Sequence, residues 1–157
     1  MLIEVSFGLW VGDDEVDRVG FAGACVHANK HPCHLSAVGY KGSLPKDHPE
    51  YLVARRGLDL YLNVIDAPLP TLFRLEPFQA ALNFIDEQQR IREVAGHCNQ
   101  GLSRAPAIAA LWLAKRAKVI AGGSWPEAKA AFLKWMPAFS PGAGIDAFLA
   151  TRWEEIA

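Results

Sequence analysis

The feature that most constrains the fold is a short apolar run that passes through a small polar loop into a long apolar helix. Residues 94–107 read VAGHCNQGLSRAPA. Residues 94–97 indicate a short buried strand, and apolar residues surround almost the whole predicted helix 104–118. Pro106 suits a first helical turn, where no backbone N–H bond is lost. This order of strand, tight loop and helix predicts an α/β unit whose loop lies at a helix N-terminus.

The rest of the chain also alternates between strand and helix patterns. Strands are predicted at 2–5, 8–11, 21–27 and 58–65, and helices at 13–18, 77–93, 126–136 and 145–156. Residues 28–50 are rich in Lys, His, Gly and Pro and predict a long, partly ordered loop with a further strand at 36–40. We therefore expect one α/β domain over residues 1–157, with a central, mainly parallel sheet of four to five strands flanked by helices.

Composition excludes several classes of protein. The chain has 157 residues, of which 51% are hydrophobic, and a formal net charge of −1, so no overall basic field favours nucleic acid or membrane partners. No apolar run approaches a membrane span, and the start carries no basic secretory pattern. Three cysteines without a disulfide-scaffold spacing favour a reducing compartment, and we expect a cytoplasmic location. The oligomeric state stays open.

The loop carries residues suited to binding and attacking an anion. Free N–H groups at a helix N-terminus attract anions, and Gly101 lets the backbone curl closely around one. Cys98 supplies a nucleophile whose reactive thiolate form is favoured by the positive end of the helix. Arg104 offers a planar fork for two oxygens of a tetrahedral oxyanion. We therefore expect Cys98 and Arg104 to hold a phosphate group between nucleophile and clamp.

The neighbouring loop residues have supporting roles in this interpretation. Ser103 would donate its hydroxyl hydrogen to the sulfur once the leaving group departs, and His97 would fix the loop from outside the phosphate site and tune Cys98. The residues expected to contact the phosphate are Asn99, Gln100, Gly101, Leu102, Ser103 and Arg104. The alternative interpretation is a buried structural Cys98 beside a solvated Arg104.

The string HCNQGLSRAP resembles the phosphate-binding loop of the cysteine-dependent phosphatases, specifically the dual-specificity tyrosine phosphatase family. Every defined position of that pattern is present between residues 97 and 106. The resemblance covers roughly residues 58–150 and, more loosely, residues 8–27. It implies hydrolysis through a cysteinyl-phosphate intermediate, without a cofactor or metal. It also implies a general acid, an Asp about thirty residues before the Cys, and Asp66 precedes Cys98 by 32 residues.

Topology supports Asp66 independently of the resemblance. The predicted strands 58–65 and 94–97 are joined by one helix, as in a right-handed crossover. Their C-terminal ends then meet at the same edge of the sheet, where ligands of open α/β folds bind. Asp86, in the middle of a predicted helix, and Asp59, at the opposite end of the strand, are less well placed to act as the general acid. The alternative role for Asp66 is that of a turn or cap residue.

The segment 27–34 concentrates His27, His31, Cys33 and His34. Its spacing matches no common zinc pattern and no second cluster exists in the sequence, so no metal site is expected. Cys33 could also be a redox partner for Cys98. We prefer the segment as a wall of the active-site cleft, with the cations Lys30 and Lys41 facing the substrate.

The expected substrate is a phosphorylated protein or peptide that carries phosphotyrosine, with phosphoserine and phosphothreonine as further candidates. A phosphoinositide is less expected, because phosphatases for these lipids usually carry basic residues inside the loop, and residues 99–103 contain none. An RNA 5′-phosphatase and a phosphate-binding module without turnover stay open as alternatives.

Overall fold

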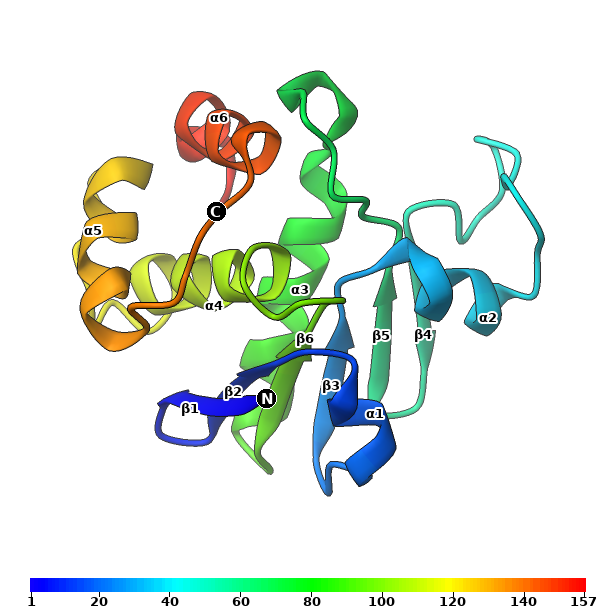
Figure 1. The fold of residues 1–157 in the computed structure, drawn as a ribbon, viewed down its shortest axis with the longest axis horizontal. Helices are drawn as coiled ribbons and strands as arrows, with labels where there is room; N and C mark the ends of the chain where they lie inside the picture. Colours follow the sequence, from blue (N-terminus) through cyan, green and yellow to red (C-terminus); the bar gives the residue numbers. More distant parts are fainter.

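A six-stranded mixed sheet forms the centre of the protein in the computed structural model, which describes all of residues 1–157. The sheet order is β1-β2-β6-β3-β5-β4 (Figure 1). The strands are β1 (Leu2–Ser6), β2 (Leu9–Gly12), β3 (Ala24–His27), β4 (Val53–Arg56), β5 (Asp59–Leu62) and β6 (Val94–His97). The expected α/β domain with a central sheet is confirmed.

The four inner strands β2, β6, β3 and β5 run parallel, whereas β1 and β4 pair antiparallel at the two edges. The C-terminal ends of β6 and β5 therefore lie at the same edge of the sheet, as expected, with β3 between them. The sheet has one strand more than predicted. Sequence patterns missed β4, a four-residue edge strand half of which consists of the exposed residues Arg55 and Arg56.

The helices follow the predicted order with small changes at their ends. They are α1 (Glu15–Val19), α2 (Leu35–Val38), α3 (Leu75–Gln89), α4 (Arg104–Lys115), α5 (Trp125–Trp135) and α6 (Ala143–Arg152). A π-helical turn spans Lys30–His34, and 3₁₀ turns span Pro70–Leu72 and Trp153–Glu155. None of the helices is both long and apolar enough to cross a bilayer.

The strand predicted at 36–40 is wrong, because these residues belong to helix α2 and its end. Gly39 adopts a left-handed conformation with φ of 91°, and its N–H donates to the Leu35 carbonyl. A glycine in this conformation closes a helical turn. Four residues of mixed polarity are too few for periodicity to distinguish a helix from a strand.

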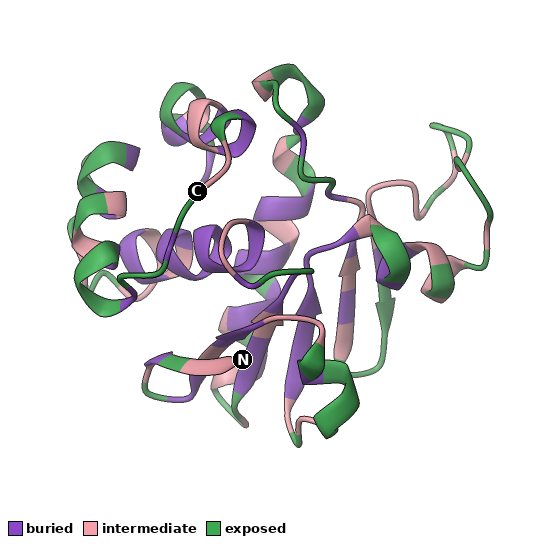
Figure 2. Ribbon diagram, viewed as in Figure 1, coloured by how far each residue is buried: buried purple, intermediate pink, exposed green.

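The two faces of the sheet carry cores of very different size. Alternate strand residues, such as Val26 and Val94, join a cluster of 36 buried residues that includes side chains of α3, α4, α5 and α6. In Figure 2 buried residues run along nearly all of α4. The opposite face holds a cluster of only three buried residues, Val16, Cys25 and Ala95. We call these the thick face and the thin face; α1 covers the thin one.

Candidate active site

The loop between β6 and α4 begins with a buried thiol. Cys98 is 2% exposed, and its backbone N–H donates to the Gly12 carbonyl at 3.3 Å. Its Sγ accepts a hydrogen bond from the Ala105 N–H in the first turn of α4, at 3.5 Å. The sulfur therefore lies at the N-terminal, positive end of the dipole of a 12-residue helix.

Gly101 allows this loop to lie directly against the N-terminal hairpin. Its φ is +71°, and a Cβ at this position would lie 2.8 Å from the backbone carbonyl of Gly12. Both the left-handed conformation and the close approach exclude a larger residue without strain. The loop therefore packs directly against the end of β2 at Gly12.

The backbone N–H groups of residues 99–103 donate no hydrogen bond to any acceptor of the protein. Five consecutive free donors in a tight loop at a helix N-terminus form a site suited to an oxyanion. The backbone N–H groups of Asn99 to Ser103 are therefore available to a ligand, and their contact with a phosphate group stays a prediction.

Arg104 is buried although it carries a full positive charge. The residue is 7% exposed, and its Nη1 donates to the Val64 carbonyl at 3.0 Å. Its Nη2 donates to Asn99 Oδ1 at 2.7 Å. Its Nε is buried without any partner. Because burying an unpaired donor is costly, this Nε–H points to a ligand that would complete its bonding.

Asn99 uses its side chain to brace the site. Its Oδ1 accepts from Arg104, and its Nδ2 donates to Asp14 Oδ2 at 3.1 Å and to the His31 carbonyl at 2.9 Å. Asn99 thus links the arginine to the residues before α1. Sequence reasoning did not single out Asp14. The signal that could have found it is its position after β2, a strand that ends at the same sheet edge.

Ser103 and Asp66 both lie close to Gly142. The Gly142 N–H donates to Ser103 Oγ at 2.9 Å. A Cβ at Gly142 would lie 3.1 Å from Asp66 Oδ1 and 3.7 Å from Ser103 Oγ. The exposed Asp66, which follows β5 by four residues, is therefore brought next to the loop. The segment before α6, whose Ser140 N–H donates to the Leu102 carbonyl at 2.8 Å, was not predicted to contribute.

His97 faces the thin side of the sheet, because it alternates with Gly96, whose α-carbon faces Ala105 of α4. It is fully buried, and its Nε2 lies 2.6 Å from Nδ1 of His27. Burial, followed by the neighbouring His27, lowers the pKa of His97 below its usual value. The expected position outside the phosphate site is consistent with this orientation.

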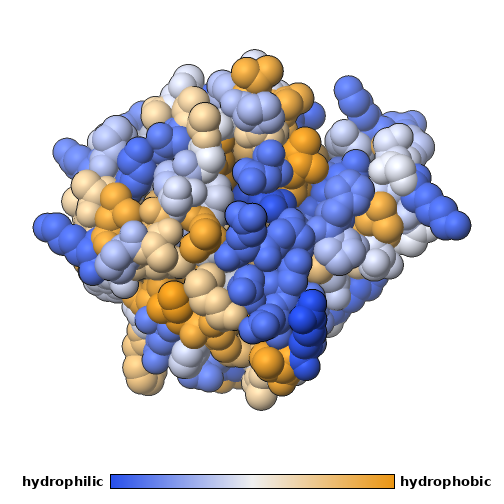
Figure 3. Space-filling view, viewed as in Figure 1, coloured by the Kyte–Doolittle hydropathy of each residue, from blue (hydrophilic) through white to orange (hydrophobic).

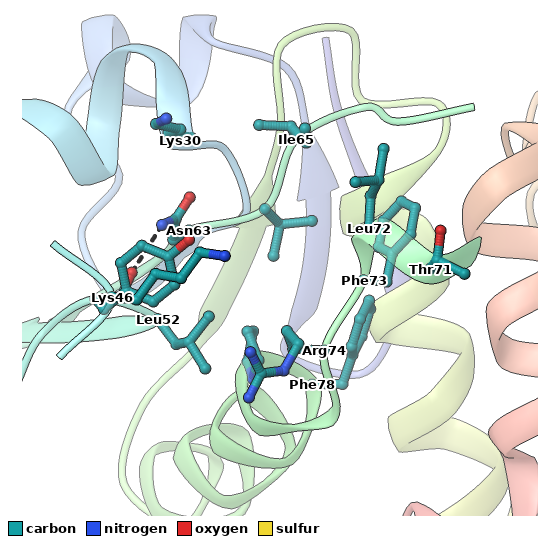
Figure 4. A pocket seen from close by; sticks show the side chains of 13 residues that line it. Lys30, Lys46, Leu52, Asn63, Ile65, Thr71, Leu72, Phe73, Arg74 and Phe78 are labelled. Carbon is teal, nitrogen blue, oxygen red and sulfur yellow. Dashed lines mark hydrogen bonds between the residues drawn. The ribbon is translucent and has the colours of Figure 1, made fainter. Parts of the chain in front are cut away.

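A cavity of about 270 Å³ lies next to the segment that leads to Asp66, and none of residues 98–104 lines it. Two of its lining residues connect it to the site: the Val64 carbonyl accepts a hydrogen bond from Arg104, and Ile65 directly precedes Asp66. Figure 4 shows Lys46 extending from one side and Phe73 and Phe78 from the other. Lys30 lines the cavity and Lys41 does not; contact of either lysine with a substrate stays a prediction. In Figure 3 hydrophilic residues gather around α1 and the loop before α4 on the same face of the molecule.

Comparisons with known proteins give a match in structure only. No family model and no curated protein sequence matches the chain. The human tyrosine phosphatase-like serine/threonine/tyrosine-interacting protein has a TM-score of 0.63 at 19% identity, covering 99% of this chain and 96% of its own. Human DUSP28 has a TM-score of 0.60 at 21% identity, covering 98% and 93%. The chain has the dual-specificity phosphatase fold.

A third structural neighbour is a phosphatase that is also known in complex with a lipid. PTPMT1 has a TM-score of 0.63 at 16% identity, covering 99% of this chain and 96% of its own, and it is also known in complex with PI(5)P. The phosphatase fold therefore spans nearly the whole of residues 1–157. At these identities the comparison establishes the fold, and the roles of individual residues rest on the geometry described above.

Proposed function

We propose that this protein is a cysteine-dependent phosphatase that hydrolyses phosphotyrosine in proteins or peptides, with phosphoserine and phosphothreonine as further candidate substrates. The observation that carries the proposal is the buried Arg104 Nε, which has no partner and belongs to the same loop as Cys98 and five free N–H groups. A phosphate dianion would satisfy all of these donors at once.

The first step is transfer of the phosphoryl group to Cys98. The thiolate attacks phosphorus, the bond to the tyrosyl oxygen breaks, and Asp66 gives its proton to that oxygen. Arg104 and the N–H groups of the loop hold the three non-bridging oxygens as charge builds up on them. The products of this step are free tyrosine hydroxyl and a cysteinyl-phosphate.

The second step returns the enzyme to its starting state. The Asp66 carboxylate takes a proton from water, the water oxygen attacks phosphorus, and the bond between sulfur and phosphorus breaks. Ser103 Oγ already accepts from the Gly142 N–H, so its own hydrogen is free to donate to the departing sulfur. None of these steps requires a metal or an organic cofactor.

The cavity next to the segment that leads to Asp66 supports a peptide substrate. Its lining combines the apolar residues Phe73 and Phe78 with the cations Lys30, Lys46 and Arg74. Such a surface suits a peptide that carries acidic and apolar residues next to its phosphotyrosine. Lys30→Ala should raise KM for acidic phosphopeptides and leave p-nitrophenyl phosphate turnover unchanged. An unchanged KM on every peptide would remove the cavity from substrate binding.

The decisive experiment compares the wild type with Cys98→Ser on p-nitrophenyl phosphate and on a phosphotyrosyl peptide. We expect Cys98→Ser to lose turnover on both and to retain most of its affinity for the phosphate analogue tungstate. Cys25→Ser, which changes another buried thiol, is the matched control and should stay active. Turnover by Cys98→Ser at the wild-type rate would refute the proposed nucleophile.

The role of Asp66 is tested through the leaving group. Asp66→Asn should lower kcat on the phosphotyrosyl peptide by about 10²–10⁴, the usual contribution of general acid–base catalysis. The loss should be much smaller for p-nitrophenyl phosphate, whose leaving group needs little protonation. Equal losses on both substrates would argue against an acid role.

A phosphoinositide is the second candidate substrate. PTPMT1 has this fold and is known in complex with PI(5)P, and the cations of the cavity could serve an inositol phosphate. The loop residues 99–103 carry no basic side chain, which favours the peptide. A panel of phosphotyrosyl peptide, PI(5)P and 5′-triphosphorylated RNA, compared by kcat/KM, separates these substrates. Tungstate binding without turnover on the whole panel would instead indicate a phosphate-binding module.

A further inference from the structure

Four potential metal ligands converge on the thin face of the sheet, next to the loop but outside it. They are Asp17 of α1, His27 at the end of β3, Cys33 in the π-helical turn, and His97 at the end of β6. One ligand atom from each lies within 4.8 Å of the other three. Both histidines and Cys33 are buried, whereas Asp17 is partly exposed and leaves a route from solvent.

The distances within this cluster resemble those around a tetrahedral zinc ion. His97 Nε2 lies 3.4 Å from Asp17 Oδ2, His27 Nδ1 lies 3.4 Å from Asp17 Oδ1, and Cys33 Sγ lies 3.6 Å from Asp17 Oδ2. Ligands at the usual bond lengths of tetrahedral zinc lie about 3.3–3.6 Å apart. The two imidazole nitrogens, at 2.6 Å, would need to separate for an ion to enter, and Asp17 would bind it through one of its two oxygens.

An outer hydrogen bond to Asp59 points the Nδ1 lone pair of His27 into the cluster. His27 Nε2 lies 2.9 Å from Asp59 Oδ1, which places a proton on Nε2 and leaves Nδ1 free. His97 Nδ1 lies 3.5 Å from Asp14 Oδ1 but is buried without a hydrogen-bond partner, so no outer hydrogen bond fixes the tautomer of this ring. A carboxylate behind a ligating imidazole is the usual arrangement at zinc sites. The two ring nitrogens that face each other at 2.6 Å must hold either a shared proton or a metal ion between them.

We propose that Asp17, His27, Cys33 and His97 bind one structural Zn²⁺ ion. A thiolate, a carboxylate and two neutral imidazoles neutralise the charge of the ion, and four protein ligands leave no open position for a substrate. Binding releases the Cys33 thiol proton to solvent. The ion would join α1 to the sheet and hold His97, the residue directly before Cys98. The site does not depend on the phosphatase proposal.

The ligand set differs from the one that the sequence offered. Among the residues of the segment 27–34, His31 is exposed, and the nitrogens of His34 are occupied by Tyr40 Oη and the Glu50 carbonyl, both at 2.8 Å. Only two ligands come from that segment. The other two ligands come from α1 and β6, so no local spacing in the sequence predicts the site.

The test begins with the wild-type protein, stripped with chelator and dialysed against Zn²⁺ or Co²⁺. We expect one tightly bound zinc per chain by elemental analysis. The cobalt form should show visible bands of tetrahedral intensity and a near-ultraviolet band of thiolate-to-cobalt charge transfer. Absence of stoichiometric metal would overturn the proposal and indicate a proton shared between the two histidines.

Conservative variants identify the ligands. Cys33→Ser should lose the charge-transfer band, and Asp17→Asn, at a partly exposed position, should lower zinc affinity by more than tenfold without unfolding the chain. His31→Ala is the matched control from the same segment and should keep full affinity. Cys98→Ser should also keep the band. Loss of the band in Cys98→Ser and not in Cys33→Ser would place the metal on the nucleophile and refute this site.

The hydrogen bond between His27 Nε2 and Asp59 allows a further test of the site. Asp59→Asn keeps the size of the side chain but weakens the acceptor for His27 Nε2. Zinc affinity should fall about 10–100-fold, as at other sites that lose such a partner. Unchanged affinity would mean that His27 is not oriented as the proposal requires, and would count against it.

Discussion

The two faces of the sheet are stabilised in different ways although they meet at the same functional edge. The thick face carries a core of 36 buried residues, the thin face a core of three. Each large buried side chain contributes about 1.5–3 kcal/mol, so hydrophobic burial can fix α4 firmly and α1 only weakly. The thin face instead concentrates His27, His97 and carboxylates. We infer that hydrophobic packing on the thick face positions the loop 98–104. The structure of the thin face depends instead on polar contacts or on bonds to a metal ion.

Among the changes that contrast the two faces, the largest expected effect is on the thick face, at the buried cation Arg104. Arg104→Lys keeps the charge but cannot present a fork to two oxygens. The kcat on p-nitrophenyl phosphate should fall about 10²–10³-fold, the usual cost of removing one oxyanion donor. Wild-type turnover in this variant would show that the buried guanidinium does not contact the phosphate.

Matched truncations compare the two cores directly. Leu111→Ala removes a fully buried side chain of α4 and should lower the free energy of unfolding by about 2–5 kcal/mol. Val16→Ala on α1 removes two methyl groups and should cost about 1–2 kcal/mol. Chemical denaturation of both variants measures the difference. Equal losses would contradict the distinction between a thick and a thin face.

The link between the two faces is Asn99, which contacts Arg104 on one side and Asp14 on the other. Asn99→Ala removes a charge-assisted hydrogen bond worth about 1.5–3 kcal/mol, so kcat/KM should fall roughly 10–100-fold. Asp14→Asn leaves the bond to Arg104 in place and should cost less than Asn99→Ala. The reverse order of the two effects would show that the arginine is held from elsewhere.

The smallest expected effect is at the rim of the thick face. Arg55 forms two bonds with Glu87, at 2.8 and 3.1 Å, and both side chains are about half exposed. Exposed pairs of this kind are worth about 0–1 kcal/mol. Arg55→Ala should therefore change the free energy of unfolding by less than about 1 kcal/mol. A larger loss would mean that β4 depends on this pair.

The sequence predicted the thick face much better than the thin one. The loop 98–104, its helix and the position of Asp66 after β5 all follow from local patterns and from the right-handed crossover of parallel strands. The brace through Asn99, the contact of Gly142 with Ser103 and the cluster of Asp17, His27, Cys33 and His97 do not. Each of these joins residues that are distant in the chain, and no periodicity or spacing records such contacts. Edge strand β4 and helix α2 were missed because four-residue elements carry too little pattern.

The central claim, that Cys98 is the nucleophile, is tested most directly by trapping its phosphorylated form. The enzyme is mixed with excess phosphotyrosyl peptide, quenched in acid within one turnover, digested and examined by mass spectrometry. The account predicts one added phosphoryl group on the peptide that contains Cys98, and none in Cys98→Ser. A wild-type enzyme that turns over substrate while this peptide stays unmodified at every quench time would contradict it.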